Sequence, residues 1–237
     1  MLTERQSQIL KTLIKEHVKT AEPVSSDFLA KRHDFGLCPS AIRIEMNILL
    51  RGGFLEQPHT SAGRIPTDKA YRHFVNQILE EKEKEKETAI EQEIENLIKK
   101  DFEDRLKFAS GLAKLLAETS SSLAIIHFLN NRISLKEGWD ELVNEPEFFD
   151  RSFITGLIDF VDNFEEKIKK INTEGMNVYI GREIALPKIR NMSLICSTCQ
   201  LAPEEKIFVS ILGPRRMDYG RNINLIQRLN KALNENL

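Results

Sequence analysis

SAIRIEMNILLRGGFLEQPHTSAGRIPTDKAYRHFV, residues 40–75, begins with the pattern of an amphipathic helix. Its apolar residues recur at the spacing of one buried face, with about 3.6 residues per turn: Ile42, Met46 and Leu49. Two consecutive glycines, Gly52 and Gly53, favour a C-cap and a turn at the end of this helix. We therefore expect the chain to leave the helix there and to reverse its direction.

The segment after the glycines predicts two short strands joined by a polar loop. One strand begins at Phe54–Leu55, and Arg64–Pro66 can return beside it. The loop between them reads PHTSAG, and its Gly63 can take a positive φ. Thr67 then caps a further helix. This order of elements is typical of a winged helix-turn-helix, whose helix enters the DNA major groove while its loop, the wing, reaches the backbone or the minor groove.

Residues 1–39 predict the two helices that complete such a domain. Thr3 and Gln6 have the spacing of a capping box. The helix after them carries one apolar stripe, which consists of Ile9, Leu10, Leu13, Ile14 and Val18. Ser25 or Ser26 then caps a short second helix. Three helices and a wing fill about eighty residues, which is enough for a complete winged helix domain.

The outer face of the third helix carries the first candidate DNA-binding residues. The side chains that we expect to point outward are Ser40, Ile44, Asn47 and Arg51, with Arg43 at the edge. Arginine and asparagine suit the edges of guanine and adenine, and an exposed isoleucine can contact a thymine methyl group. The alternative interpretation is a solvated helix face with ordinary polar residues.

The wing and the helix after it carry the second set of candidates. In the loop these are His59, Thr60, Ser61 and Arg64, and at the start of the next helix they are Lys69 and Arg72. Small residues beside hydrogen-bond donors allow a phosphate to approach closely. The alternative is a plain surface loop, and we expect Tyr71 and Phe74 to be core residues.

Composition places few limits on function. The 237 residues carry a net charge of −2, while residues 1–80 hold eleven Lys and Arg against nine Asp and Glu, a mild excess that permits DNA contact. The first residues, MLTERQSQIL, lack a signal pattern, and no apolar run approaches the ~18 residues of a membrane span. We therefore expect a soluble, cytoplasmic protein.

The chain shows no pattern of a catalytic, metal or cofactor site. Cys196 and Cys199 have the spacing of half a zinc site, but no second pair completes it, so we expect structural cysteines. Glu145 and Glu147 are expected to serve the N-terminus of a helix. Arg215 and Arg216 precede a helix start, where an anion could bind, but we expect them to be solvated or paired with Asp218. We predict that the protein is not an enzyme.

Beyond residue 79 the pattern predicts a charged linker and a second domain. Residues 80–100 are mostly alternating charges, which indicates a solvated helix or a hinge between residues 1–79 and residues 101–237. After an amphipathic helix that includes Phe102 and Leu106, we expect strands at 123–129, 176–181, 191–200 and 206–213, and helices at 146–172 and 218–235. The longer of these helices should bury Phe153, Leu157, Ile158, Val161, Phe164 and Ile168. This is an α+β domain with a small antiparallel sheet.

Several motifs resemble the HrcA family, the heat-inducible repressors of bacterial chaperone operons. The wing LEQPHTSAGRIPTDKAYRHFV carries the resemblance, together with LTERQ, EPV and the P-x-x-IR-x-EM pattern of the third helix. In the second half NEPEFFD, NVYIGRE and ILGPRRMDYGRNI match further family segments. Three residues depart from the family pattern: Asp27 replaces Arg, Ala41 replaces Thr and Ile44 replaces Asn. A long inserted family segment is also missing, and only NNRISLKEGWDELVN stands in its place.

The resemblance implies a function and partners. It implies a homodimeric repressor with a winged helix-turn-helix and a truncated GAF-like α+β dimerisation domain. Such a dimer would bind an inverted-repeat operator in double-stranded DNA, control chaperone genes, and be released by heat or by loss of support from a chaperonin. The alternative is a ligand- or protein-interaction module whose winged helix no longer reads the family operator, an interpretation that the three departures favour.

Overall fold

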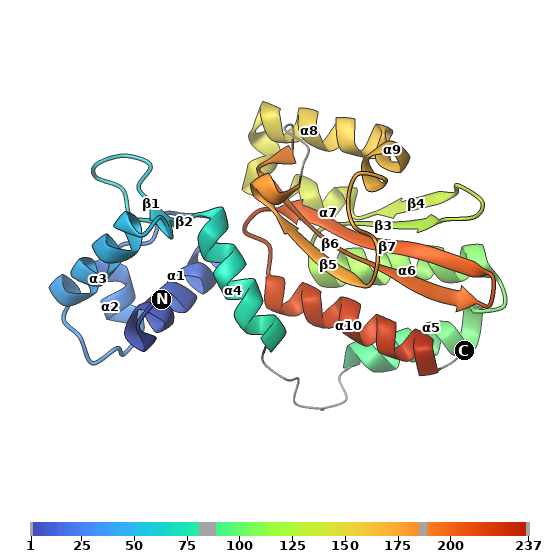
Figure 1. Cartoon of the computed structure of the whole chain (residues 1–237), viewed down its shortest axis with the longest axis horizontal. Helices are drawn as coiled ribbons and strands as arrows, with labels where there is room; N and C mark the ends of the chain where they lie inside the picture. Colours follow the sequence, from blue (N-terminus) through green and yellow to red (C-terminus); the bar gives the residue numbers. More distant parts are fainter. Residues whose placement is uncertain (1, 81–88, 185–188, 236–237) are drawn as a thin grey trace. The chain divides into compact units, whose positions relative to one another are not determined.

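The computed structural model describes residues 2–80, 89–184 and 189–235 of the chain. It divides into two compact units, Met1–Lys82 and Glu83–Leu237. Figure 1 labels the helices and strands of both units. The α+β class expected from the sequence is confirmed, because the first unit is mainly helical and the second is built around a sheet.

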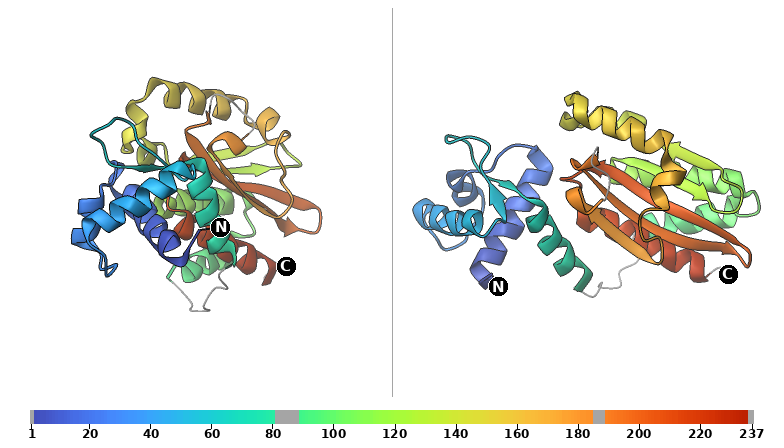
Figure 2. Two further views of the ribbon diagram at one scale, coloured as in Figure 1. Left: turned by 60° about the vertical axis from the view of Figure 1, so that its left-hand side comes forward. Right: turned by 45° about the horizontal axis from the view of Figure 1, so that its top comes forward.

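The first unit is a winged helix-turn-helix. Its elements are α1 (Glu4–Thr20), α2 (Ser26–Arg32), α3 (Pro39–Arg51), β1 (Leu55–Glu56), β2 (Ile65–Pro66) and α4 (Asp68–Glu80). β1 and β2 pair antiparallel, and the loop between them stands out from the helices in both views of Figure 2. The helices, the strand pair and the wing thus occur in the order that the sequence predicts.

Local capping explains where these helices begin. The capping box is present at α1, where Gln6 N donates to Thr3 Oγ1 and Thr3 N donates to Gln6 Oε1. Ser25 caps α2 by accepting a hydrogen bond from Phe28 N at 3.1 Å. Thr67 caps α4, because its hydroxyl accepts from Ala70 N and donates to the carbonyl of Gly53. The predicted caps are confirmed, and Ser25 is the one used at α2.

The first unit has one shared apolar core. The buried face of α3 is confirmed, since Ile42, Met46 and Leu49 are almost fully buried. Four of the five predicted stripe residues of α1 are also buried: Ile9, Leu10, Leu13 and Ile14. Tyr71 and Phe74 are buried as expected. Burial of each large apolar side chain contributes about 1.5–3 kcal/mol, so this core fixes the direction in which α3 faces.

Gly63 is required for a reason that the sequence did not suggest. Gly63 does not adopt the positive φ that a glycine allows, because it is absent from the positive-φ residues of the described chain. A Cβ atom at Gly63 would lie 2.6 Å from the backbone of Val24. The backbone of the wing therefore passes so close to the segment before α2 that only glycine fits.

The second unit is a five-stranded antiparallel sheet between two layers of helices. The strands lie in the order β4-β3-β7-β6-β5. They are β3 (Leu123–Phe128), β4 (Ser134–Glu137), β5 (Met176–Ile180), β6 (Met192–Ala202) and β7 (Glu205–Pro214). One face is covered by α5 (Ala89–Asp101), α6 (Arg105–Ser120) and α10 (Tyr219–Glu235), as Figure 1 shows.

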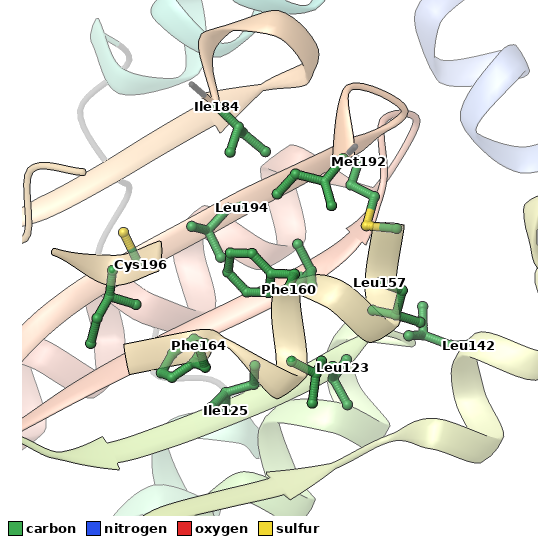
Figure 3. Packing of buried hydrophobic residues seen from close by; sticks show 14 of the residues in the cluster. Leu123, Ile125, Leu142, Leu157, Phe160, Phe164, Ile184, Met192, Leu194 and Cys196 are labelled. Atoms are coloured by element: carbon green, nitrogen blue, oxygen red, sulfur yellow. The ribbon is translucent and has the colours of Figure 1, made fainter. Parts of the chain in front are cut away.

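The other face of the sheet carries the main core of this unit. It is covered by α7 (Trp139–Val143), α8 (Arg151–Asp162) and α9 (Phe164–Ile168), as Figure 1 shows, and the 3-10 helix η1 (Pro146–Phe149) adds Phe148 to the same cluster. A second 3-10 helix, η2 (Gly181–Glu183), follows β5. Figure 3 shows Phe160 and Phe164 packed over alternate residues of the strands, among them Ile125 and Leu194. Alternation along the strands therefore sends every second side chain into this cluster.

The sequence predicted most strands and helices of the second unit, but not the breaks between its short helices. The four predicted strands correspond to β3, β5, β6 and β7, and the last predicted helix to α10. β4 and α7 were not predicted. The single helix at 146–172 is wrong, because Asp150 has extended backbone and caps α8 by accepting from Ser152 N at 2.7 Å. Asn163 then separates α8 from α9.

Some expected burial is also corrected. Leu106 and Ile158 are each 50% exposed, so they lie outside the core. Phe102 is half-buried and precedes α6 rather than belonging to it. Residues 89–100, which the sequence assigned to a charged linker, form most of α5, whose Ile94 and Ile98 are buried in the layer with α6 and α10. The remaining residues of that linker, 81–88, lie outside the described residues.

The cysteine pair is structural, as expected. Cys196 joins the cluster under α8, whereas Cys199 Sγ donates to Asn230 Oδ1 of α10 at 2.9 Å, on the opposite face of the sheet. Burial raises the pKa of each thiol to about 12. Within the described residues no group of three His, Cys, Asp or Glu side chains could hold a metal ion. Among the helices of the described residues, none is long and apolar enough to cross a membrane.

His127 is a buried titratable side chain of β3 that packs against the main core. It is 4% exposed, its Nδ1 lies 2.8 Å from Ser134 Oγ, and its ring packs against Phe164. Burial lowers the pKa of His127, the charge of Glu165 opposes that shift, and the charge of Lys136 adds to it. The folded state therefore binds fewer protons than the unfolded state just below the ordinary pKa of 6.5.

This predicts a loss of stability at mildly acid pH. Between about pH 7.5 and about pH 5.5, the free energy of unfolding should fall because the unfolded imidazole gains a proton that the folded one resists. The variant His127→Leu should show a smaller fall of its thermal midpoint over the same interval. Thermal melts at both pH values check this, and equal falls for the parent and the variant would contradict it.

Candidate nucleic-acid interface

The exposed face of α3 contains the residues that the sequence placed there. Ser40, Arg43 and Arg51 are exposed, and Asn47 is half-buried. Ile44 is 61% exposed, which agrees with its expected position away from the core. Ile48, one turn further on and 45% exposed, was missed, although the same helical spacing could have identified it. The outer face therefore combines the polar residues Ser40, Arg43 and Arg51 with two exposed isoleucines, Ile44 and Ile48.

α2 determines the direction of the Arg43 side chain. Its Nε donates to Ser26 Oγ at 3.3 Å, and its Nη2 lies 3.6 Å from Asp27 Oδ2. Both side chains of the Arg43–Asp27 ion pair are about 60% exposed, so solvent screens the pair and it contributes little to stability. Its main effect is to direct the guanidinium group toward α2. Sequence reasoning identified Arg43 but missed Ser26 and Asp27 as its partners.

Arg64 joins the wing to two other elements. Its backbone forms an antiparallel bridge with Val24, with N–O distances of 2.8 and 2.9 Å. Its guanidinium Nη2 donates to Asn47 Oδ1 of α3 at 3.2 Å, and Nη1 donates to the carbonyl of Ala62 at 3.3 Å. The structure thus brings two predicted DNA-binding residues, Arg64 and Asn47, into direct contact. The base of the wing is fixed against α3.

The loop of the wing is shaped by hydrogen bonds of its own. Gln57 Nε2 donates to the carbonyls of Thr60 and Ala62 at 2.8 and 3.0 Å, and Ala62 N donates to the carbonyl of His59 at 2.9 Å. Gln57 was not among the predicted residues, and nothing in the sequence singles it out. His59, Thr60 and Ser61 remain exposed at the tip. Their donors are therefore available on a loop of defined shape.

A polar cleft of about 360 Å³ separates the wing from α3. Its lining comes from three elements and includes Ser26 of α2, Arg43 and Asn47 of α3, and Ser61 and Arg64 of the wing. A groove with arginine, asparagine and serine donors suits the sugar-phosphate edge of a duplex. Residues of α3 form one side of this cleft, and residues of the wing form the other.

Lys69 and Arg72 lie on α4 behind this surface. Lys69 Nζ donates to the carbonyl of Gly52 at 2.8 Å and lies 4.4 Å from the centre of the Phe54 ring. Its ammonium group thereby lies at the C-terminal end of α3, where the helix dipole favours a cation. Lys69 therefore supports the end of α3 from α4. Arg72 is half-buried.

The N-terminal end of α3 carries the third cysteine. Cys38 occupies the N-cap position without capping the helix, and its Sγ lies 3.1 Å from Ser40 Oγ. The hydrogen bond with the Ser40 side chain lowers the pKa of this exposed thiol, with a smaller contribution from the backbone of Ala41. The predicted residue Ser40 thus has an intramolecular partner at the entry of the helix.

Comparisons with known proteins agree on one family. The family model described as "HrcA protein C terminal domain" matches residues 55–223. The heat-inducible transcription repressor HrcA of Natranaerobius thermophilus is 28% identical, covering 98% of this chain and 96% of the relative. The protein of the same name from Carboxydothermus hydrogenoformans is 25% identical over 341 residues, covering 99% and 98%. Since this chain has 237 residues, that relative carries a long stretch with no counterpart here.

One solved structure has the same fold. The structure described as "Crystal structure of a hypothetical protein at 2.2 A resolution" superposes with a TM-score of 0.86, covering 99% of this chain and 98% of its own. It is 18% identical, so the similarity concerns the fold alone.

The Arg43–Asp27 pair yields a test of the helix face. Asp27→Asn should strengthen binding to the inverted-repeat duplex, because Arg43 no longer has to leave its ion pair with Asp27 before it contacts the DNA. The slope of log K against log salt should stay the same if Arg43 contacts a base edge, and should steepen by about 0.9 if it contacts one phosphate. Fluorescence anisotropy with a labelled duplex at several salt concentrations measures both quantities.

The matched control is Asp34→Asn. Asp34 is an exposed acid of the same unit whose carboxylate accepts from Gly36 N at 2.9 Å. Its replacement removes the same charge but releases no arginine. Equal gains in both variants would show that Arg43 is not restrained by Asp27.

Proposed function

This chain belongs to the HrcA family, and from that premise we propose that it is a transcription repressor that binds double-stranded DNA through α3 and the wing of its first unit. The observation that carries the proposal is the hydrogen bond between Arg64 and Asn47, which joins the wing to the face of α3 that points away from the core. The relatives are named heat-inducible transcription repressors, which supports the same role.

In the proposed complex, α3 lies in the major groove and the wing follows the adjacent backbone. Arg43, Asn47 and Arg51 face base edges or phosphates, and Ile44 faces a thymine methyl group. His59, Thr60 and Ser61 donate to phosphates from the wing tip, while Lys69 supports the end of the helix. The departure at Ile44 alters which bases are read, because an isoleucine cannot hydrogen-bond.

The protein acts as a homodimer on an inverted repeat. Two copies of α3 held at a fixed distance read two half-sites, so the dimer binds a palindrome more tightly than either copy binds alone. The second unit supplies the contact between the two copies. The bound dimer blocks the promoter of chaperone genes, and heat or loss of chaperonin support releases it. The protein works in the cytoplasm, where the DNA is.

Competitive binding to operator DNA tests the proposal. The full chain should bind a duplex with the inverted repeat from its neighbouring chaperone promoter, and a shuffled duplex of the same composition much more weakly. Arg43→Ala should cost about 1–3 kcal/mol on the repeat and less on the shuffled duplex, because a base contact is lost. Gel shifts with competitor DNA measure the difference, and light scattering gives the mass of the bound form.

The control variant is Lys114→Ala, which removes an exposed cation of the second unit. It should leave both affinities unchanged. The rival function, an interaction module without operator reading, predicts that repeat and shuffled duplex bind equally and that Arg43→Ala changes nothing. That outcome, or one monomer per duplex, would overturn the proposal.

A further inference from the structure

α7 and η1 present three large apolar side chains to solvent. Trp139 is 39% exposed, Val143 48% and Phe149 87%. Trp139 and Val143 lie one helical turn apart and share one side of α7, which packs beside η1. Single exposed apolar residues are ordinary, but neighbouring ones that include aromatic rings are characteristic of contact surfaces. We call these three residues the α7 surface.

The backbone beneath the α7 surface is held by the core. Leu142 is fully buried, and Phe148 packs against the same cluster. Figure 3 shows Leu142 beside Leu157 at one end of that cluster. α7 and η1 therefore each send one apolar residue inward while the residues next to it in the chain point outward.

Two further contacts restrain this segment. Gly138, which comes directly before α7, has a φ of +99° and lies close to the backbone just before β3. A Cβ atom at Gly138 would lie 2.3 Å from the carbonyl oxygen of Ser122. At the other end Arg216, whose side chain is 10% exposed, donates to both carboxylate oxygens of Glu147, at 2.7 and 2.9 Å, and also binds Glu145. Sequence reasoning had assigned these three side chains to other roles. A surface ordered in this way loses little conformational entropy when it binds.

The α7 surface lies in the most acidic stretch of the second unit. Residues 137–150 contain six Asp and Glu and no Lys or Arg, although the whole chain has 36 acids and 34 bases. Arg216 pairs with both Glu145 and Glu147 and offsets one of their two negative charges. No lysine or arginine of the described residues pairs with Glu137, Asp140 or Glu141. These three carboxylates therefore leave a negative rim beside the apolar side chains.

This charge decides what can cover the surface. A second copy of the chain would place the same acidic rim opposite itself across a two-fold axis, and like charges at an interface are costly. DNA is excluded for the same reason. A partner that fits must offer apolar side chains flanked by Lys or Arg.

We propose that the α7 surface binds a basic amphipathic segment of another protein. Trp139, Val143 and Phe149 receive the apolar side of that segment, and Glu137, Asp140 and Glu141 pair with its lysines or arginines. This surface is separate from α3 and the wing, so the interaction adds to DNA binding and does not depend on it. Trp139 and Val143 lie in residues 130–144, which by the family resemblance stand in place of the long segment, and Phe149 follows this stretch.

Trp139, the single tryptophan of the chain, makes the test direct. The probe is a synthetic amphipathic helical peptide of leucine and lysine, titrated into the full chain. Its binding should shift the Trp139 emission to shorter wavelength, because the indole leaves water. A peptide of the same pattern with glutamate in place of lysine should cause no shift.

Variants locate the binding surface. Phe149→Ser, and separately the pair Asp140→Lys and Glu141→Lys, should each weaken binding of the lysine peptide about ten-fold or more. Ile158→Ser, which removes another half-exposed apolar side chain from α8, should leave it unchanged. Thermal melts confirm that each variant is folded. The variants should also bind duplex DNA like the parent.

Three outcomes would overturn the proposal. Equal binding of the lysine and glutamate peptides would remove the charge argument. Unchanged affinity in the Phe149 and Asp140/Glu141 variants would place the peptide elsewhere. If Phe149→Ser instead halves the mass of the protein in light scattering, the surface is covered by a second copy of this chain.

Discussion

One arginine fixes the base of the wing against α3. A two-residue strand pair has little stability of its own, since a short hairpin in water is marginal. Arg64 supplies the missing restraint, because its backbone pairs with Val24 while its guanidinium reaches Asn47 on α3. The missing side chain of Gly63 permits the close approach that this pairing needs. The base of the wing is consequently held against the outer face of α3.

Periodicity and caps predicted the first unit well for a physical reason. The burial of Ile42, Met46 and Leu49 follows from local spacing, and each helix start follows from a nearby polar side chain. Local patterns do not show where a side chain points when its hydrogen-bond partner is distant in the sequence. Asn47 and Arg64 are such a pair, and their bond was not predicted.

In the second unit, too, local sequence patterns missed short elements and contacts between distant residues. β3, β6 and β7 were found from their buried apolar runs, and β5 was found although it is mostly half-buried. β4 is shorter, is half-buried and gives no clear alternation. Arg216 and its partner Glu147 are 69 residues apart, so their ion pair could not be read from the sequence. The resemblance to the HrcA family is confirmed by the comparisons, yet it gave no account of the shortened segment. There the structure places β4 and α7, which complete the sheet and its covering layer.

A double-mutant cycle tests the coupling of helix and wing most directly. The free energy of binding to the inverted-repeat duplex would be measured for the parent, Asn47→Ala, Arg64→Ala and the double variant. If the bond between the two residues holds the wing in place for DNA, the losses are not additive, and the coupling energy is about 0.5–3 kcal/mol. Strictly additive losses, or no loss in either single variant, would contradict the account of a single DNA-reading surface.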